Sequence, residues 1–214
     1  MFVASIAVII EHMTNGCILP VSFLLTGNPT YYNLALYGEV AFMIYATTLL
    51  LTSYALQRDV SIEQMHPAVW HLLILHHVAS MMLCIGCIMF GDVVPKQLVC
   101  YVLLALLGLT SSLHYIGMIL DIGPLSLANS PCIRLGHHVI CLLLQIIFRG
   151  VYWLRLTALV FLHTLEVHSL WVLVAVMVPM LLFTAFNVDF IKFHVKATRG
   201  CFRQMQQYNQ FKQT

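Results

Sequence analysis

Long apolar runs, each close to the length needed to cross a lipid bilayer, restrict how this chain can fold more than any other feature. Six such runs fall at residues 1–26, 32–56, 67–90, 97–120, 137–162 and 168–190. A helix needs about 20 predominantly apolar residues to span the hydrocarbon core. The runs are continuous rather than alternating, which argues against a membrane β-barrel. The sequence therefore predicts an all-α fold, a polytopic membrane bundle of about six transmembrane helices.

The composition supports a membrane protein and excludes several functional classes. The 214 residues are 61% hydrophobic and only 8% charged, which is too little charge for a soluble domain. The net charge of +2 does not predict a nucleic-acid partner. Cysteines at positions 84 and 87 are one turn apart inside an apolar run, where small apolar residues are the better interpretation than a metal or redox pair. No metal and no cofactor is expected.

The distribution of basic residues predicts the orientation. Half of the lysines and arginines fall in residues 191–214, a segment that the positive-inside rule assigns to the cytosol. Six spans then place the N-terminus in the cytosol too. Arg58 and Arg134 fall in cytosolic links under this assignment, and Lys96 falls in a lumenal one. We expect a multi-pass membrane protein whose C-terminus lies in the cytosol.

Two adjacent histidines lie in the middle of the third run. At 1.5 Å per residue, His76 and His77 lie about 15 Å into the span, near the midplane of the bilayer. Ser80 is one helical turn further on, so a single polar stripe can hold all three side chains and face other helices. Polar groups at this depth are costly and tend to mark functional sites. His76 and His77 are candidate catalytic residues, with a purely structural role as the alternative.

Other spans carry polar residues at similar depth. Arg149 lies about 18 Å into the fifth run, where a charge is costly unless it is held inside the bundle. The fourth run carries Thr110, Ser111 and His114, and the sixth carries Asn187 near its end. Hydroxyl groups in membrane helices usually bond their own backbone, so the two hydroxyls have packing as their alternative role. Together these residues predict one buried polar centre that binds substrate: Ser80, Thr110, Ser111, His114, Arg149 and Asn187.

The order of these features resembles the TLC-domain family of ceramide synthases, translocation-associated proteins and non-synthase relatives. The resemblance covers about residues 35–205. The chain then divides into a first span and its link (1–31), a TLC-like transmembrane domain (32–205) and a polar cytosolic tail (206–214). Four segments carry the resemblance: a Gly-Tyr-Phe-like segment from Gly38 to Tyr45, a paired-histidine segment from Leu75 to Ser80, a Phe-x-x-Arg-like segment from Phe148 to Val151, and a closing segment from Phe186 to Ile191.

The resemblance implies a membrane protein of the endoplasmic reticulum or another endomembrane that acts on lipids. In ceramide synthases the paired histidines supply the general base that joins an acyl-CoA to a long-chain base, and acidic residues complete the site. This chain has Leu109-Thr110-Ser111-Ser112 and Ala46 where the family places acidic residues. A histidine without an orienting carboxylate is a weaker base. A non-synthase member, concerned with membrane lipid composition or lipid trafficking, therefore fits better than an acyltransferase that uses acyl-CoA.

Three alternatives to lipid handling follow from the residues. An N-acyltransferase would use His76 or His77 as its base and acyl-CoA as a substrate. A di-metal hydroxylase needs HxxxH and HxxHH clusters, and the histidine spacings here do not provide them. A transporter is disfavoured because the chain shows no duplicated halves. The expected partners are membrane lipids, with acyl-CoA in the synthase case and a homo-oligomer left open.

Overall fold

The computed structural model describes residues 2–56, 67–90, 94–108, 110–113, 116, 131–167 and 169–213. The described chain is helical and has no strands, which confirms the predicted all-α fold. In this part of the chain, five helices are long and apolar enough to cross a membrane: Ile6–Thr26, Pro29–Thr52, Lys96–Leu113, Cys132–Glu166 and Leu170–Gln207. Ile74–Met89 forms a shorter apolar helix. The protein is an integral membrane protein.

The spans are built from α-helices with π-helical insertions. In chain order the elements are α1 (Phe2–Met13), π-helical η1 (Thr14–Ile18), α2 (Leu19–Thr26), α3 (Pro29–Leu56), α5 (Pro67–Met89), α6 (Lys96–Leu103), π-helical η2 (Leu104–Gly108), α8 (Pro131–Leu144), π-helical η4 (Gln145–Tyr152), α9 (Trp153–Glu166) and α10 (Leu170–Gln213). Thus α1, η1 and α2 make the first span, α6 and η2 lie in the fourth, and α8, η4 and α9 make the fifth.

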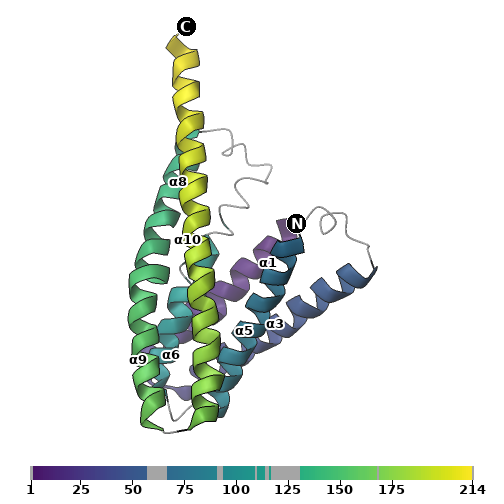
Figure 1. Ribbon diagram of the computed structural model, residues 1–214, viewed down its shortest axis with the longest axis vertical. Coiled ribbons are helices and arrows are strands. Elements are labelled where there is room, and N and C mark those ends of the chain that lie inside the picture. The colour runs from purple at the N-terminus through teal and green to yellow at the C-terminus, as the bar shows by residue number, and fades with distance from the viewer. Residues whose placement is uncertain are drawn as a thin grey trace.

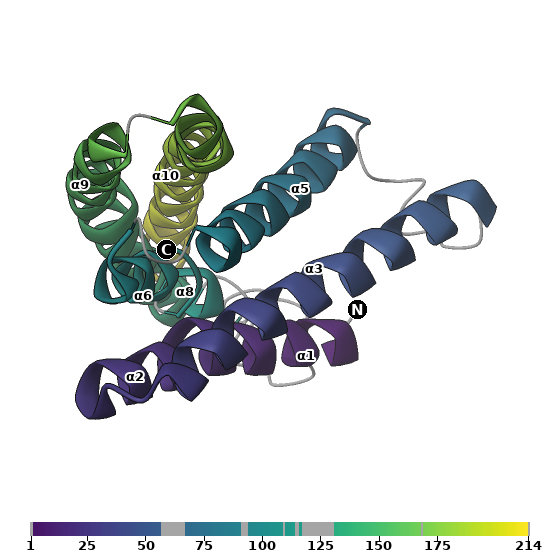
Figure 2. The same ribbon diagram turned by 90° about the horizontal axis from the view of Figure 1, so that it is seen from below.

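The spans pack in a ring whose order differs from their order in the chain (Figure 1, Figure 2). The α3 helix packs on α5, and α5 packs on α10. On its other side α10 contacts α8, η4 and α9, and α9 contacts α6. The ring closes where α6 and η2 meet the first span, which packs back on α3. Side chains that point inward from the fourth, fifth and sixth spans are therefore neighbours.

Glycines allow the first and fourth spans to touch through their backbones. A Cβ on Gly16 would lie 2.5 Å from the Leu107 Cβ, and one on Gly108 would lie 2.6 Å from the Gly16 carbonyl oxygen. Both glycines sit in π-helical segments, η1 and η2. Pro20 follows η1 and lacks the N–H that an α-helix would direct at the Gly16 carbonyl, which gives a physical reason for the wider turn there.

Two helix boundaries differ from the sequence prediction. We expected the fifth span to begin at residue 137, after a link broken by Pro131, but α8 begins at Pro131 itself. Proline suits the first turn of a helix, where its missing N–H is not needed, so it starts this helix instead of breaking it. The sixth span does not end at residue 190, because α10 continues to Gln213 as one helix (Figure 1). Its Lys, Arg and Gln residues are good helix formers.

Candidate functional site

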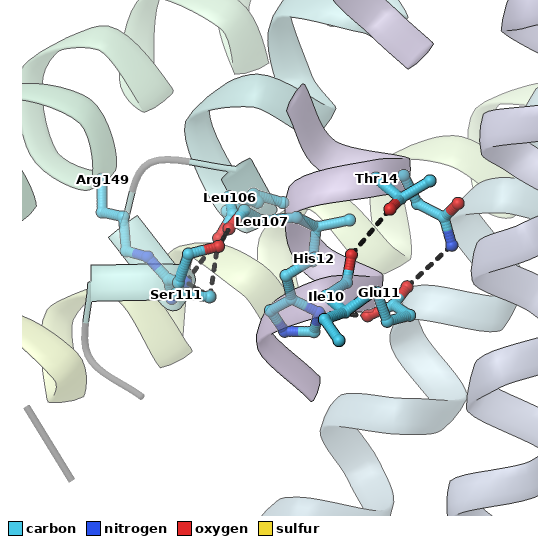
Figure 3. Close-up of polar contacts among 10 residues, drawn as sticks. Ile10, Glu11, His12, Thr14, Leu106, Leu107, Ser111 and Arg149 are labelled. Carbon is cyan, nitrogen blue, oxygen red and sulfur yellow. Dashed lines mark hydrogen bonds and ion pairs between the residues drawn. The ribbon is translucent and has the colours of Figure 1, made fainter. Parts of the chain in front are cut away.

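Arg149 is the centre of a polar cluster inside the ring. It lies in η4, and only 3% of the residue is exposed. Its Nε donates to the Thr110 hydroxyl at 2.7 Å, and its Nη1 donates to Asn187 Oδ1 at 3.4 Å. Its Nη2 donates to the Leu106 carbonyl at 2.6 Å and to the Ser111 hydroxyl (Figure 3). The guanidinium therefore joins the fourth, fifth and sixth spans.

The π-helical turn of the fourth span explains why its hydroxyls lie here. Thr110 Oγ1 donates to the Ala105 and Leu106 carbonyls at 2.9 and 3.0 Å, and Ser111 Oγ donates to the Leu106 carbonyl at 2.8 Å. The widened turn leaves carbonyls that side chains can reach, and the Leu106 carbonyl accepts from both hydroxyls and from Arg149. The expected bonding of these hydroxyls to their own backbone is confirmed.

Two buried amides complete the cluster. Gln145 and Asn187 are each 1% exposed. Gln145 Nε2 donates to the Thr110 carbonyl at 3.3 Å, while Gln145 Oε1 has no hydrogen-bond partner among the described residues. Asn187 accepts from Arg149, but within the same part of the chain its Nδ2 has no partner either. The guanidinium also lies 4.4 Å from the ring centroid of Phe190, which the sequence did not identify as part of the site.

The paired histidines point in different directions. His77 is 7% exposed, and its Nδ1 lies 3.2 Å from the Thr47 hydroxyl on α3. The His76 ring instead faces α10, where its centroid lies 5.4 Å from the centroids of both Phe183 and Phe186 in T-shaped contacts. The Nδ1 of His76 is buried, and no described residue forms a hydrogen bond with it.

The prediction of one shared polar stripe on α5 is therefore wrong. Adjacent residues on an α-helix are about 100° apart, so they cannot both face the same neighbour. His76 contacts Phe183 and Phe186 of α10, the helix that also carries Asn187 of the Arg149 cluster. His77 belongs to the α3 side. Ser80 is 4% exposed on α5.

Most of the predicted site residues that the structure describes come together. Thr110, Ser111, Arg149 and Asn187 form one hydrogen-bonded cluster, and His76 contacts Phe186, the residue before Asn187 on α10. His114 lies outside the described residues.

A second polar cluster joins the first two spans, and sequence reasoning did not assign it to a site. Glu11 Oε1 accepts from Asn15 Nδ2 at 2.8 Å, and Glu11 Oε2 contacts His12 Nδ1 (Figure 3). The Asn15 amide packs against Gly38 on α3, and the neighbouring Glu39 is 1% exposed, with no hydrogen-bond partner for its carboxyl oxygens among the described residues. The signal was present as polar residues inside the first apolar run, but nothing in that run indicates which neighbour they meet.

The ring interior also contains a small void, whose lining includes Val94, Val160 and Val176 and none of the residues of the polar cluster. Its volume is about 10 Å³, and apolar side chains from α3, α5, α6, α9 and α10 line it, including Leu36, Leu83 and Met180. A void of this size has room for about one water molecule. The packing of the described residues at this void is therefore close.

No known family model, curated protein or solved structure matches this chain. The TLC-domain resemblance stays a prediction that rests on the segments quoted above.

Proposed function

We propose that this protein handles membrane lipids, in the manner expected of a non-synthase TLC-domain protein, by holding a lipid headgroup at the cluster around Arg149 and His76. The observation that supports the proposal is a set of buried polar atoms that have no hydrogen-bond partner among the described residues: His76 Nδ1, Gln145 Oε1 and Asn187 Nδ2. They come from three spans: Gln145 and Asn187 belong to the Arg149 cluster, and His76 contacts Phe186, which precedes Asn187 on α10. A buried polar atom without a partner costs about 1–3 kcal/mol, so each one needs a physical reason.

These atoms define the chemistry of the proposed ligand. Gln145 Oε1 needs a donor, and Asn187 Nδ2 needs an acceptor. His76 Nδ1 can donate or accept according to its tautomer. A headgroup that carries hydroxyl or amide groups supplies both kinds of partner, and Arg149 adds a positive charge for a phosphate. The contact of His76 with two phenylalanine rings gives an apolar wall beside the polar atoms.

The orientation and the membrane are part of the proposal. The basic residues that follow Phe190 on α10 favour a cytosolic C-terminus, and the family resemblance favours the endoplasmic reticulum. Glycosylation acceptor sites inserted after Gln213 and in the link at residues 27–30 test this orientation. The first site should stay unmodified, and the second should be modified.

The test of the lipid proposal is mass spectrometry of lipids that co-purify with the protein. His76→Phe retains an aromatic ring for the contacts with Phe183 and Phe186 but removes both nitrogens, so the variant should fold and should retain less of the bound lipid. Tyr37→Phe is the matched control, since Tyr37 is 56% exposed on α3 and loses a polar atom away from the cluster. Equal lipid retention by the wild type and His76→Phe would reject the proposed site.

An acyltransferase that uses acyl-CoA is the second candidate, and the free Nδ1 of His76 favours it. That nitrogen is available to accept a proton from an incoming amine or hydroxyl. Against this role, the described partner of the neighbouring His77 is a hydroxyl, that of Thr47, and not a carboxylate. Radiolabelled acyl-CoA supplied to the purified protein should give an acylated lipid that the His76→Phe variant does not make, if this candidate is correct.

A further inference from the structure

A groove on the outer surface of the ring lies between α6 and α9, at the end where α6 begins and α9 ends. Its volume is about 410 Å³, and it opens toward the surroundings of the protein. The α9 side contributes Arg155, Leu159 and His163, and the α6 side contributes Gln97 and Tyr101. Because the outer surface of the ring faces lipid, this groove is open to molecules that diffuse within the bilayer.

The position of Arg155 in the groove indicates what kind of molecule binds. Arg155 is exposed, and it lies about 16 Å along the helix from Glu166, the last residue of α9. Among the described residues no carboxylate forms an ion pair with it. A cation at this depth on a surface that faces lipid is costly unless an anion reaches it. Within the part of the chain that the structure describes, the groove therefore holds a positive charge that no carboxylate neutralises.

The other groups in the groove fit the remainder of an anionic lipid. The long, flexible stem of Arg155 lets its guanidinium move along the groove, which Gln97 and His163 also line. His163 Nδ1 lies 3.8 Å from the exposed Glu166, so Arg155 is the cation available to an anion. Leu159, which is 37% exposed, gives an apolar wall for an acyl chain. Along α9 the groove extends about 16 Å from Tyr152 to His163, about half of a 30 Å hydrocarbon core.

We infer that the groove between α6 and α9 binds one anionic phospholipid from a single leaflet, with its phosphate on Arg155 and an acyl chain along Leu156 and Leu159. This site faces outward, whereas the cluster around Arg149 faces the ring interior. The inference does not depend on the proposed function. A phospholipid bound here would seal the fourth span against the fifth at this end of the ring.

The test is native mass spectrometry of the full chain in neutral detergent, titrated with phosphatidylglycerol or with phosphatidylcholine. The wild type should bind one phosphatidylglycerol more tightly than phosphatidylcholine, and Arg155→Gln should weaken that binding about tenfold, because a charge-assisted hydrogen bond is lost. Arg203→Gln is the matched control, since Arg203 is exposed on α10 away from the groove, and it should bind like the wild type. Circular dichroism and gel filtration establish that both variants fold.

Several outcomes would overturn the inference. Unchanged phosphatidylglycerol binding by folded Arg155→Gln would show that the groove does not hold the lipid. Equal weakening by Arg203→Gln would show that the attraction comes from overall charge. In a further arm, inorganic phosphate is added in excess, and the lipid should stay bound because its acyl chain contributes to binding. Displacement of the lipid by inorganic phosphate would show a simple anion site.

Discussion

Replacement of Arg149 by methionine is the most informative single change to the ring. The variant loses four described hydrogen bonds, to Thr110, Asn187, Ser111 and the Leu106 carbonyl. At about 1.5 kcal/mol for each charge-assisted bond, the gross loss is about 6 kcal/mol. The methionine also avoids the cost of about 3 kcal/mol of placing a cation at this depth in the membrane, which offsets part of that loss. We expect a net destabilisation of about 3 kcal/mol, or a fall in the unfolding midpoint of about 6–12 °C for a chain of this size.

The assay is thermal unfolding in a neutral detergent, followed by circular dichroism and by the loss of the monodisperse peak on gel filtration. Arg203→Met is the control, because Arg203 is exposed on α10 and its loss should shift the midpoint by no more than about 1–2 °C. Arg149→Lys should fall between the two, since an ammonium group cannot reach all of the acceptors that the planar guanidinium joins. If Arg149→Met and Arg203→Met unfold together, the guanidinium does not hold the three spans in place.

The remaining predictions concern packing and hydrogen bonds elsewhere in the ring. Gly16→Ala should lower the free energy of unfolding by about 1–3 kcal/mol, because the new Cβ would lie 2.5 Å from the Leu107 Cβ. Gly200→Ala has nothing within 4 Å of its new Cβ and should raise the free energy of unfolding by about 1 kcal/mol. The thermal unfolding midpoints of the two variants test both predictions. Thr184→Val removes the acceptor of a buried indole N–H at 2.9 Å and should cost about 1 kcal/mol in the same assay. Thr47→Val should change the nitrogen-15 chemical shift of His77 Nδ1, and an unchanged shift would show that the hydroxyl is not its partner.

The sequence predicts the fold class and the depth of the polar residues, because both follow from distance along a helix. Apolar runs of bilayer length give the spans, and 1.5 Å per residue places Arg149 near the middle of one of them. The energetic cost of a charge in lipid then requires that Arg149 face other helices, and the structure buries it against Thr110 and Ser111.

What the sequence could not predict is the rotation of each helix and the order of the spans around the ring. The distance along the helix places His76 and His77 at nearly the same depth and does not say which neighbour each side chain faces. The structure shows that His76 faces α10 and that His77 faces α3. The π-helical segment around Arg149 has no clear sequence signal either, although it determines which carbonyls and side chains meet. Glu39 illustrates the same limit, because its burial depends on the close packing of the first two spans.

The central claim is that polar atoms left free around Arg149 and His76 bind a lipid headgroup. Mass spectrometry of the lipids retained by gently purified wild-type protein and by the His76→Phe variant tests it most directly. We predict that the wild type retains a defined lipid whose headgroup carries hydroxyl or amide groups, and that His76→Phe retains less of this lipid while the Tyr37→Phe control retains the wild-type amount. The same lipid profile in all three proteins, at equal fold stability, would contradict the claim.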